Sequence, residues 1–248
     1  MISYDVERLK MLLRDNLPLG MVFRWRAALH QVSDAQLYRP TFQPWLLPEF
    51  RSIYREISRK TLLNAERAWT VYSLARQALG VEGDFLEAGV YRGGTALLLR
   101  RVLDRRPGPR RLHLFDTFAG MPQTDPSRDR HRQNDFGDTS VEAVSGFVGR
   151  GEKIIFHEGL IPGTFNGLEE SRFAFSHIDV DLYRSVRDCC LFVYPRTVTG
   201  GIILFDDYGF PSCPGARQAV DEFFADKPEF PLVLRTGQAV VFSTGAPA

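Results

Sequence analysis

The sequence has few of the features that direct a chain to a membrane or to nucleic acid. No stretch approaches the uninterrupted apolar length that spans a bilayer. The first residues, MISYDVERLKMLLRDN, are too highly charged for a signal peptide. The formal net charge is +1, so no bulk electric field attracts nucleic acid or an anionic lipid surface. We therefore expect neither nucleic acid nor a membrane among the partners.

Cysteine is also scarce. The three cysteines, Cys189, Cys190 and Cys213, show no spacing typical of a metal or redox motif. Cys189 and Cys190 are adjacent within an apolar helical pattern, which favours packing residues over a disulfide. This usage predicts a reducing, cytoplasmic compartment.

Internal repeats are absent, and the 248 residues suffice for one α/β domain with an N-terminal extension. We assign residues 1–80 to a helical extension that ends in a long helix over Leu62–Leu79. Within it, Tyr38–Phe50 contains three prolines and several large apolar residues. Two interpretations of that segment stay open: a loop packed on the core, or one wall of a substrate pocket.

Residues 81–248 form the second predicted domain, in which short buried strands alternate with helices. The pattern predicts strands over 84–90, 111–116, 153–159, 173–180 and 200–208, with helices over 93–103, 181–195 and 215–226 and a short one near 165–170. The stretch between the second and third strands is expected to be a long polar loop. Residues 231–236 and 238–243, joined across Gly237, look like a hairpin. The sequence therefore predicts a Rossmann-like, doubly wound, mainly parallel α/β sheet with an antiparallel edge.

Ligands of such sheets bind beyond the carboxyl ends of the strands, so the residues that end each strand carry the functional signal. The first strand ends in Glu87–Thr95 (EAGVYRGGT), an acid followed by spaced glycines. The carboxylate of Glu87 would repel a pyrophosphate, but it suits the cationic methionine part of S-adenosylmethionine. The second strand ends in Asp116, which is placed to accept hydrogen bonds from ribose hydroxyls, although a helix or turn cap is the alternative.

Two later strands end in pairs of acids. Asp179 and Asp181 follow one strand, and Asp206 and Asp207 follow the next along the chain. If these ends are neighbours, four carboxylates converge, and a hard divalent cation relieves their repulsion. An all-oxygen shell favours magnesium over zinc. His177 lies within the apolar strand and is expected to face the core.

At this point the chain resembles the macrocin-type O-methyltransferases. The resemblance runs from about Arg59 to Phe242 and rests on these strings: EAGVYRGGT (87–95), LFDTFAGMP (114–122), HIDVDLY (177–183), YPR (194–196), GGIILFDDYG (200–209) and AVDEF (219–223). Members of this family methylate sugar hydroxyls on antibiotics. The resemblance implies the class I methyltransferase fold, with S-adenosylmethionine and Mg²⁺ as cofactors.

Carried over by position, the resemblance assigns roles to individual residues. It implies that Asp179, Asp206 and Asp207 bind magnesium, and that Asp179 and Asp181 act in catalysis, with Asp181 as the general base. The implied cofactor site comprises Glu87, Gly89, Tyr91, Arg92, Gly93, Thr95, Asp116, Thr117 and Phe118. The charged segment Gln123–Thr139, hereafter the 123–139 loop, matches the position of a mobile lid.

The expected reaction is methyl transfer to a hydroxyl of a small-molecule sugar or glycoside. The sequence leaves open a metal-dependent methyltransferase of phenols or catechols. A nicotinamide-dependent sugar oxidoreductase is disfavoured because the G-x-G-x-x-G spacing is missing. A scaffold that has lost catalysis is disfavoured by the intact acidic cluster. The resemblance also implies that the N-terminal helices shape the substrate pocket and join copies into a homo-oligomer.

Overall fold

A computed structural model describes residues 43–245 of the chain. The chain divides into two compact units, Met1–Leu47 and Pro48–Ala248. In the first unit the structure describes a single 3-10 turn, η1 (Pro44–Leu46). Of the predicted N-terminal extension, the part before residue 43 lies outside the described residues, and with it the start of the Tyr38–Phe50 segment. The helix predicted over Leu62–Leu79 is present as α5 (Ala65–Ala78). The expected oligomer contacts stay a prediction.

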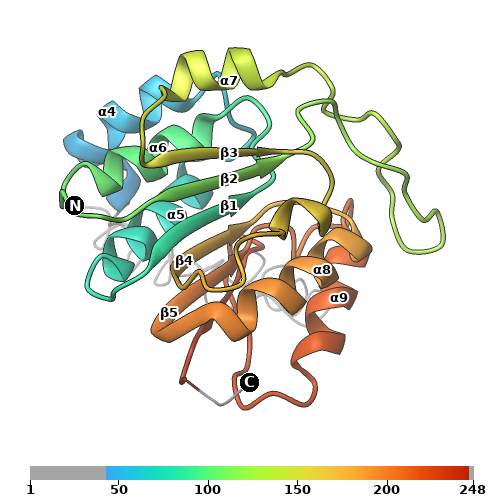
Figure 1. Cartoon of the computed structure of the whole chain (residues 1–248). Helices are drawn as coiled ribbons and strands as arrows, with labels where there is room; N and C mark the ends of the chain where they lie inside the picture. Colours follow the sequence, from blue (N-terminus) through green and yellow to red (C-terminus); the bar gives the residue numbers. More distant parts are fainter. Residues whose placement is uncertain (1–42, 246–248) are drawn as a thin grey trace, which may run out of the picture. The chain divides into compact units, whose positions relative to one another are not determined.

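The second unit is built on a seven-stranded sheet in the order β3-β2-β1-β4-β5-β7-β6 (Figure 1). Strands β1 to β5 are parallel, and β7 and β6 add an antiparallel edge beside β5. The strands are β1 (Asp84–Ala88), β2 (Leu112–Asp116), β3 (Ile154–Glu158), β4 (Phe173–Ile178), β5 (Thr197–Phe205), β6 (Leu232–Val233) and β7 (Ala239–Phe242). This arrangement confirms the predicted Rossmann-like sheet and its C-terminal hairpin.

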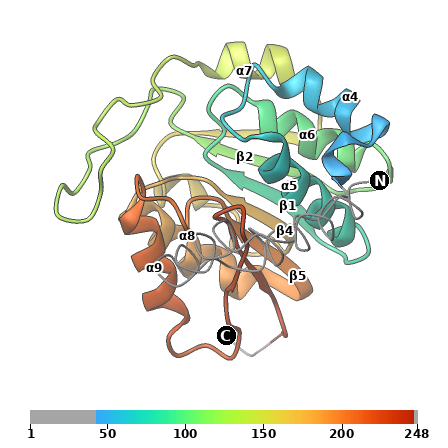
Figure 2. The same ribbon diagram turned by 180° about the vertical axis from the view of Figure 1, so that it is seen from behind.

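Helices cover both faces of the sheet (Figures 1 and 2). One face carries α4 (Pro48–Ile57), α5 (Ala65–Ala78), α6 (Gly94–Leu103) and α7 (Val141–Val148); the other carries α8 (Tyr183–Val193) and α9 (Pro214–Phe224). Helices α4 and α5 belong to the same compact unit as the sheet. The division between residues 80 and 81 stays a prediction. Among the described residues, no helix combines the length and apolarity that crossing a membrane requires.

Two local expectations were wrong. The expected long polar loop between β2 and β3 contains helix α7, which begins after Ser140 because the Ser140 side chain accepts a hydrogen bond from the Ala143 amide. In place of the short helix near residues 165–170, the structure has a 3-10 turn, η2 (Gly163–Phe165). The polar residues around α7 concealed its short apolar stripe of Val144 and Val148.

Gly89 allows the central strands to lie close together at their carboxyl ends. Its φ is +87°, in the left-handed region that favours glycine. A Cβ built at this position would overlap the backbone carbonyl oxygen of Asp179, which follows β4. The glycine therefore permits β1 and the β4 end to approach, and the acids of the two strands come within reach of one another.

We expect Gly89→Ala to lower the free energy of unfolding by about 2–4 kcal/mol, because it adds a clash to an unfavourable φ. Urea denaturation of the purified protein measures the change. The matched control is Gly146→Ala in helix α7, where a Cβ would meet nothing within 4 Å. That control should leave stability unchanged or raise it by up to about 1 kcal/mol. Equal effects of the two variants would contradict this role for Gly89.

A pair of histidines, His113 on β2 and His157 on β3, lies within the sheet and away from the acids that follow β4 and β5. His113 Nδ1 lies 3.0 Å from His157 Nε2, and His113 Nε2 lies 3.3 Å from an Asp84 carboxylate oxygen. The ring of His157 stacks on Phe115 with 4.2 Å between centroids. Burial and the neighbouring His113 lower the pKa of His157 from 6.5 to about 4. The folded state therefore favours the neutral ring of His157.

A lowered histidine pKa means that the unfolded chain binds more protons between pH 6.5 and pH 4. The stabilisation is complete above pH 6.5 and is lost as the pH falls through 4. Between pH 7 and pH 4.5, we expect the unfolding free energy of wild-type protein to fall by about 1–2 kcal/mol more than that of His157→Gln. The difference is smaller than the pKa shift alone would give because the half-buried ring retains some hydration. Urea denaturation at both pH values tests this, and an identical pH dependence would refute it.

Candidate functional site

A cavity of about 1120 Å³ opens at the carboxyl edge of the sheet. It lies where the strand order reverses between β1 and β4, which is where ligands of doubly wound sheets bind. Its walls come from the β1–α6 turn, the end of β2, the β4–α8 turn, the 123–139 loop and the segment before α9. The position agrees with the strand-end prediction made from the sequence.

Asp116 holds the turn that leads from β1 into α6. Its Oδ2 accepts hydrogen bonds from the amides of Val90 (2.7 Å) and Tyr91 (2.8 Å), and its Oδ1 accepts one from Phe118 (2.8 Å). Tyr91 and Phe118 both have a φ of 50°, which is uncommon for residues other than glycine. The carboxylate therefore stabilises two unfavourable backbone conformations, and the turn-cap interpretation of Asp116 describes its contacts in this structure.

The structure distributes the predicted cofactor residues unevenly. Five of them line the cavity: Gly89, Tyr91, Thr95, Asp116 and Thr117. The other four have different surroundings. Glu87 is fully buried, Gly93 packs on α7, Phe118 is buried near Phe156, and Arg92 pairs with Asp138 on the surface. Their assignment to the cofactor site stays a prediction.

Glu87 and His177 form a buried pair beneath the strand ends. Both side chains are 0% exposed, and Glu87 Oε1 lies 3.2 Å from His177 Nδ1. The second oxygen, Oε2, has no hydrogen-bond partner within the described residues. Burial, together with the charges of Asp179 and Asp116, raises the pKa of Glu87 well above its usual range. His177 is buried as predicted, but its ring is held between carboxylates rather than among apolar side chains alone.

Three aspartates reach the cavity from two neighbouring strands. Asp179 and Asp181 are partly exposed there, and Asp207 is 7% exposed. Asp207 Oδ2 accepts a hydrogen bond (3.1 Å) from the amide of Asp181, which has a φ of 56°. Burial and Asp181 raise the pKa of Asp179 to about 7, and burial together with Asp181 and Asp179 raises the pKa of Asp207 well above its usual range. The structure thus brings together the predicted acids, and their local negative charge is incompletely balanced.

Asp206, the fourth acid, lies beneath the cavity and is 0% exposed. It forms an ion pair with Arg67 of helix α5 and accepts a hydrogen bond from Gln238 Nε2 at 2.6 Å. His177 Nε2 lies 3.4 Å from the same carboxylate. Arg67 and Gln238 were not predicted from the sequence, in which nothing local links either residue to the acids at the strand ends.

The 123–139 loop runs beside the cavity without a helix or strand of its own (Figure 1). Asp129 fastens it to the core: one carboxylate oxygen accepts a hydrogen bond from the Tyr183 amide at the start of α8 (2.9 Å), and the other accepts one from the Asp125 amide (3.1 Å). Asp129 is 6% exposed despite its charge. The loop therefore has a defined attachment next to the acids.

The donor atoms at the strand ends are mainly carboxylate oxygens, which a hard divalent cation prefers, with one histidine nitrogen among them. Asp179, His177 and Asp206 bring one potential ligand atom each to within 4.8 Å of one another, and Asp207 adjoins them. Burial first, and then the neighbouring carboxylates, raise the pKa of both Asp179 and Asp207, and a bound cation would oppose both effects. Arg67 pairs with Asp206, and Gln238 donates a hydrogen bond to the same carboxylate. A metal ion bound by Asp206 would therefore compete with both residues.

Comparison with known proteins gives one family. The family model described as macrocin-O-methyltransferase (TylF) matches residues 57–232. A Streptomyces olivaceus enzyme named 8-demethyl-8-(2,3-dimethoxy-alpha-L-rhamnosyl)-tetracenomycin-C 4'-O-methyltransferase is 32% identical over 157 residues, which are 58% of this chain and 59% of that enzyme. Mycinamicin III 3''-O-methyltransferase of Micromonospora griseorubida is 30% identical over 181 residues, 66% of this chain and 69% of the relative.

A solved structure shows the same fold. The O-methyltransferase NovP superposes with a TM-score of 0.68 at 26% sequence identity, covering 79% of this chain and 89% of NovP. The match to the tetracenomycin enzyme spans less than two thirds of that relative's length. The comparisons confirm both the resemblance and the class of fold expected from the sequence.

The contacts of Asp116 give a test of the site's construction. We expect Asp116→Asn to lower the free energy of unfolding by about 2 kcal/mol, because an amide nitrogen cannot accept the bonds that a carboxylate oxygen accepts. The amides of Val90 and Tyr91 should also exchange hydrogen faster, as followed by NMR. The control, Asp226→Asn, alters a carboxylate that is 78% exposed and contacts Lys227, and it should leave hydrogen exchange at both amides unchanged. Unchanged exchange at both amides would contradict the proposed support of the turn.

Proposed function

We propose that this chain, which belongs to the macrocin O-methyltransferase family, transfers a methyl group from S-adenosylmethionine to a hydroxyl of a sugar or glycoside. The observation that carries the proposal is the group of partly exposed carboxylates, Asp179 and Asp181, in a cavity at the strand-order reversal. The name of the tetracenomycin relative includes a rhamnosyl group, which is a sugar. This similarity favours a sugar acceptor over a phenol. A deoxysugar on a natural product is the substrate class that we propose.

The negative charge of the cavity supports the choice of methyl donor. Asp116 and Asp179 line the cavity, and Glu87 is buried beside them: burial, then the charges of Asp179 and Asp116, raise the pKa of Glu87. Such a group repels a dinucleotide pyrophosphate and attracts the cationic sulfonium and ammonium groups of S-adenosylmethionine. Tyr91, Thr95 and Thr117 also line the cavity and would contact the cofactor.

For the metal we propose magnesium, held by Asp179, Asp206 and Asp207. When bound, the ion would supply positive charge that offsets these carboxylates and favours ionisation of a nearby hydroxyl. Asp207 meanwhile fixes the backbone of Asp181 through its hydrogen bond to that amide. Arg67 offsets the negative charge of Asp206, so the charges of Asp179 and Asp207 would remain to neutralise the ion.

Asp181 is the proposed general base. An alkyl hydroxyl is a poor nucleophile because its pKa is near that of water, about 16. Burial raises the pKa of Asp181, which makes its carboxylate a better proton acceptor. As the acceptor oxygen forms its bond to the methyl carbon, the carbon–sulfur bond breaks and the hydroxyl proton passes to Asp181. The cavity walls contribute by holding oxygen, carbon and sulfur in line.

We also propose a cytoplasmic location and a small-molecule substrate. The three cysteines are free and buried, as expected of residues that pack in a reducing compartment. The proposed homo-oligomer would form through the predicted N-terminal extension, of which residues 1–42 lie outside the described residues.

Substitution of the acids tests the proposal. We expect Asp179→Asn and Asp181→Asn each to lower kcat by at least about 100-fold, since one removes a metal ligand and the other the proton acceptor. S-adenosylmethionine affinity should stay close to that of wild type, as measured by calorimetric titration. The control is Asp226→Asn, whose carboxylate is 78% exposed and contacts Lys227. The Asp226→Asn control should alter neither kcat nor S-adenosylmethionine affinity. Equal losses of turnover and cofactor affinity in a folded Asp179→Asn protein would contradict the assignment.

A further inference from the structure

Three metal-binding side chains of different chemistry meet at the edge of the cavity. His131 comes from the 123–139 loop, Asp181 from the β4–α8 turn, and Cys213 from the residue before α9. Asp181 Oδ1 lies 3.2 Å from Cys213 Sγ and 3.5 Å from His131 Nε2, and the sulfur lies 3.6 Å from that same nitrogen. All three residues line the cavity.

We propose that His131, Asp181 and Cys213 form a second metal site, which binds zinc or a similar thiophilic divalent ion. Zinc bonds of about 2.0–2.3 Å at tetrahedral angles place the ligand atoms about 3.3–3.6 Å apart. The three observed separations, 3.2, 3.5 and 3.6 Å, are close to that triangle. Because all three residues line the cavity, a fourth ligand position would be open to water or substrate, as in catalytic zinc sites.

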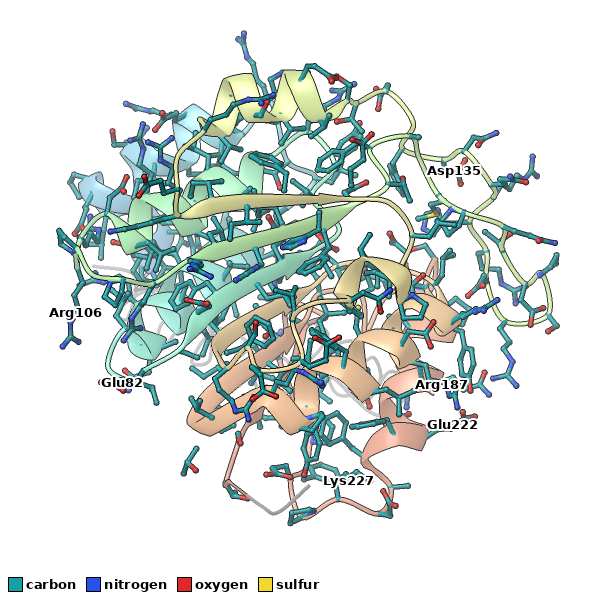
Figure 3. All side chains as sticks on the ribbon, viewed as in Figure 1. Glu82, Arg106, Asp135, Arg187, Glu222 and Lys227 are labelled. Atoms are coloured by element: carbon teal, nitrogen blue, oxygen red, sulfur yellow. The ribbon has the colours of Figure 1, made fainter. Side chains whose placement is uncertain are left out.

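The surroundings of His131 support this assignment. Its second ring nitrogen, Nδ1, lies 3.4 Å from an Asp135 carboxylate oxygen. That oxygen also accepts a hydrogen bond from the Arg132 amide at 2.9 Å, which holds the carboxylate in place. Asp135 lies on the 123–139 loop (Figure 3). A carboxylate behind a histidine is the usual arrangement that orients a metal-binding imidazole.

The choice of donors separates this site from the one proposed for magnesium. A sulfur and a ring nitrogen favour zinc or cobalt, whereas magnesium prefers oxygen ligands. In the metal-free protein the Cys213 thiol donates its hydrogen bond to Asp181. Burial and the nearby acids raise the pKa of that thiol, so a binding ion would replace its proton. The ion forms a bond to the thiolate sulfur, and one proton passes to solvent.

Zinc at this position would occupy the carboxylate of Asp181 and tie the 123–139 loop to the start of α9. We therefore expect zinc to inhibit methyl transfer even when magnesium is saturating. The inhibition rests on the proposed function of Asp181, but the binding site itself does not.

Cobalt absorption spectroscopy tests the site, because cobalt replaces zinc and reports its ligands. Metal-stripped full-length protein is titrated with Co²⁺ in saturating Mg²⁺. We expect one equivalent to bind with a sulfur-to-cobalt charge-transfer band and with tetrahedral visible bands. Cys213→Ala should lose the charge-transfer band. The matched control, Cys190→Ala, removes another buried free thiol and should retain it.

Asp135→Asn provides a variant that alters no proposed ligand. It should weaken cobalt and zinc binding by about 10–100-fold while keeping the charge-transfer band at saturation. The zinc concentration for half inhibition, relative to the variant's own uninhibited rate, should rise by the same factor. His131→Ala should abolish tight binding.

The proposal is overturned if wild-type protein shows no sulfur band, or if the band persists in Cys213→Ala or binding stays tight in His131→Ala. A sulfur band without inhibition by zinc would keep the metal site and instead contradict the role of Asp181 as general base. Failure of the proposed function and failure of the metal site are thus distinguishable.

Discussion

The repulsion among buried carboxylates is the constraint on which the rest of this site depends. Glu87, Asp179, Asp181, Asp206 and Asp207 converge where β1, β4 and β5 end. Burial raises the pKa of Glu87, Asp179, Asp181 and Asp207. The fold offsets part of this cost with Arg67 and Gln238 on Asp206, and with His177 between Glu87 and Asp206. The remaining negative charge makes the cavity wall suited to cations. The proposed sulfonium donor and the proposed divalent metal would both supply positive charge there.

The same chemistry shapes the backbone. Tyr91, Phe118 and Asp181 adopt positive φ values at three different strand ends, a conformation that costs non-glycine residues free energy. Carboxylates hold each one: Asp116 accepts from the amides of Tyr91 and Phe118, and Asp207 accepts from that of Asp181. Some acids thus act as structural acceptors, while others face the cavity. The strain is concentrated where we propose that ligands bind.

The fold and the acids were predictable from sequence because their signals are local. Buried strands, helical periodicity and strand-end acids give the sheet, and the parallel order brings β4 and β5 together. The partners of the acids were not predictable, since Arg67 precedes the first strand and Gln238 lies in the final hairpin. His131 and Cys213 are 82 residues apart in sequence, and a polar loop carries no periodicity that would place His131 beside Asp181. Helix α7 was missed because it is only eight residues long and directly follows a polar loop.

The most direct test of the account is calorimetric titration of purified, metal-stripped protein with S-adenosylmethionine, with and without magnesium, and with NAD as the control. The cavity's negative charge and the missing dinucleotide spacing lead us to expect binding of the methyl donor and no binding of NAD. Magnesium should then be required for methylation of a glycoside acceptor rather than for binding of the donor. Binding of NAD without binding of S-adenosylmethionine would contradict the central claim.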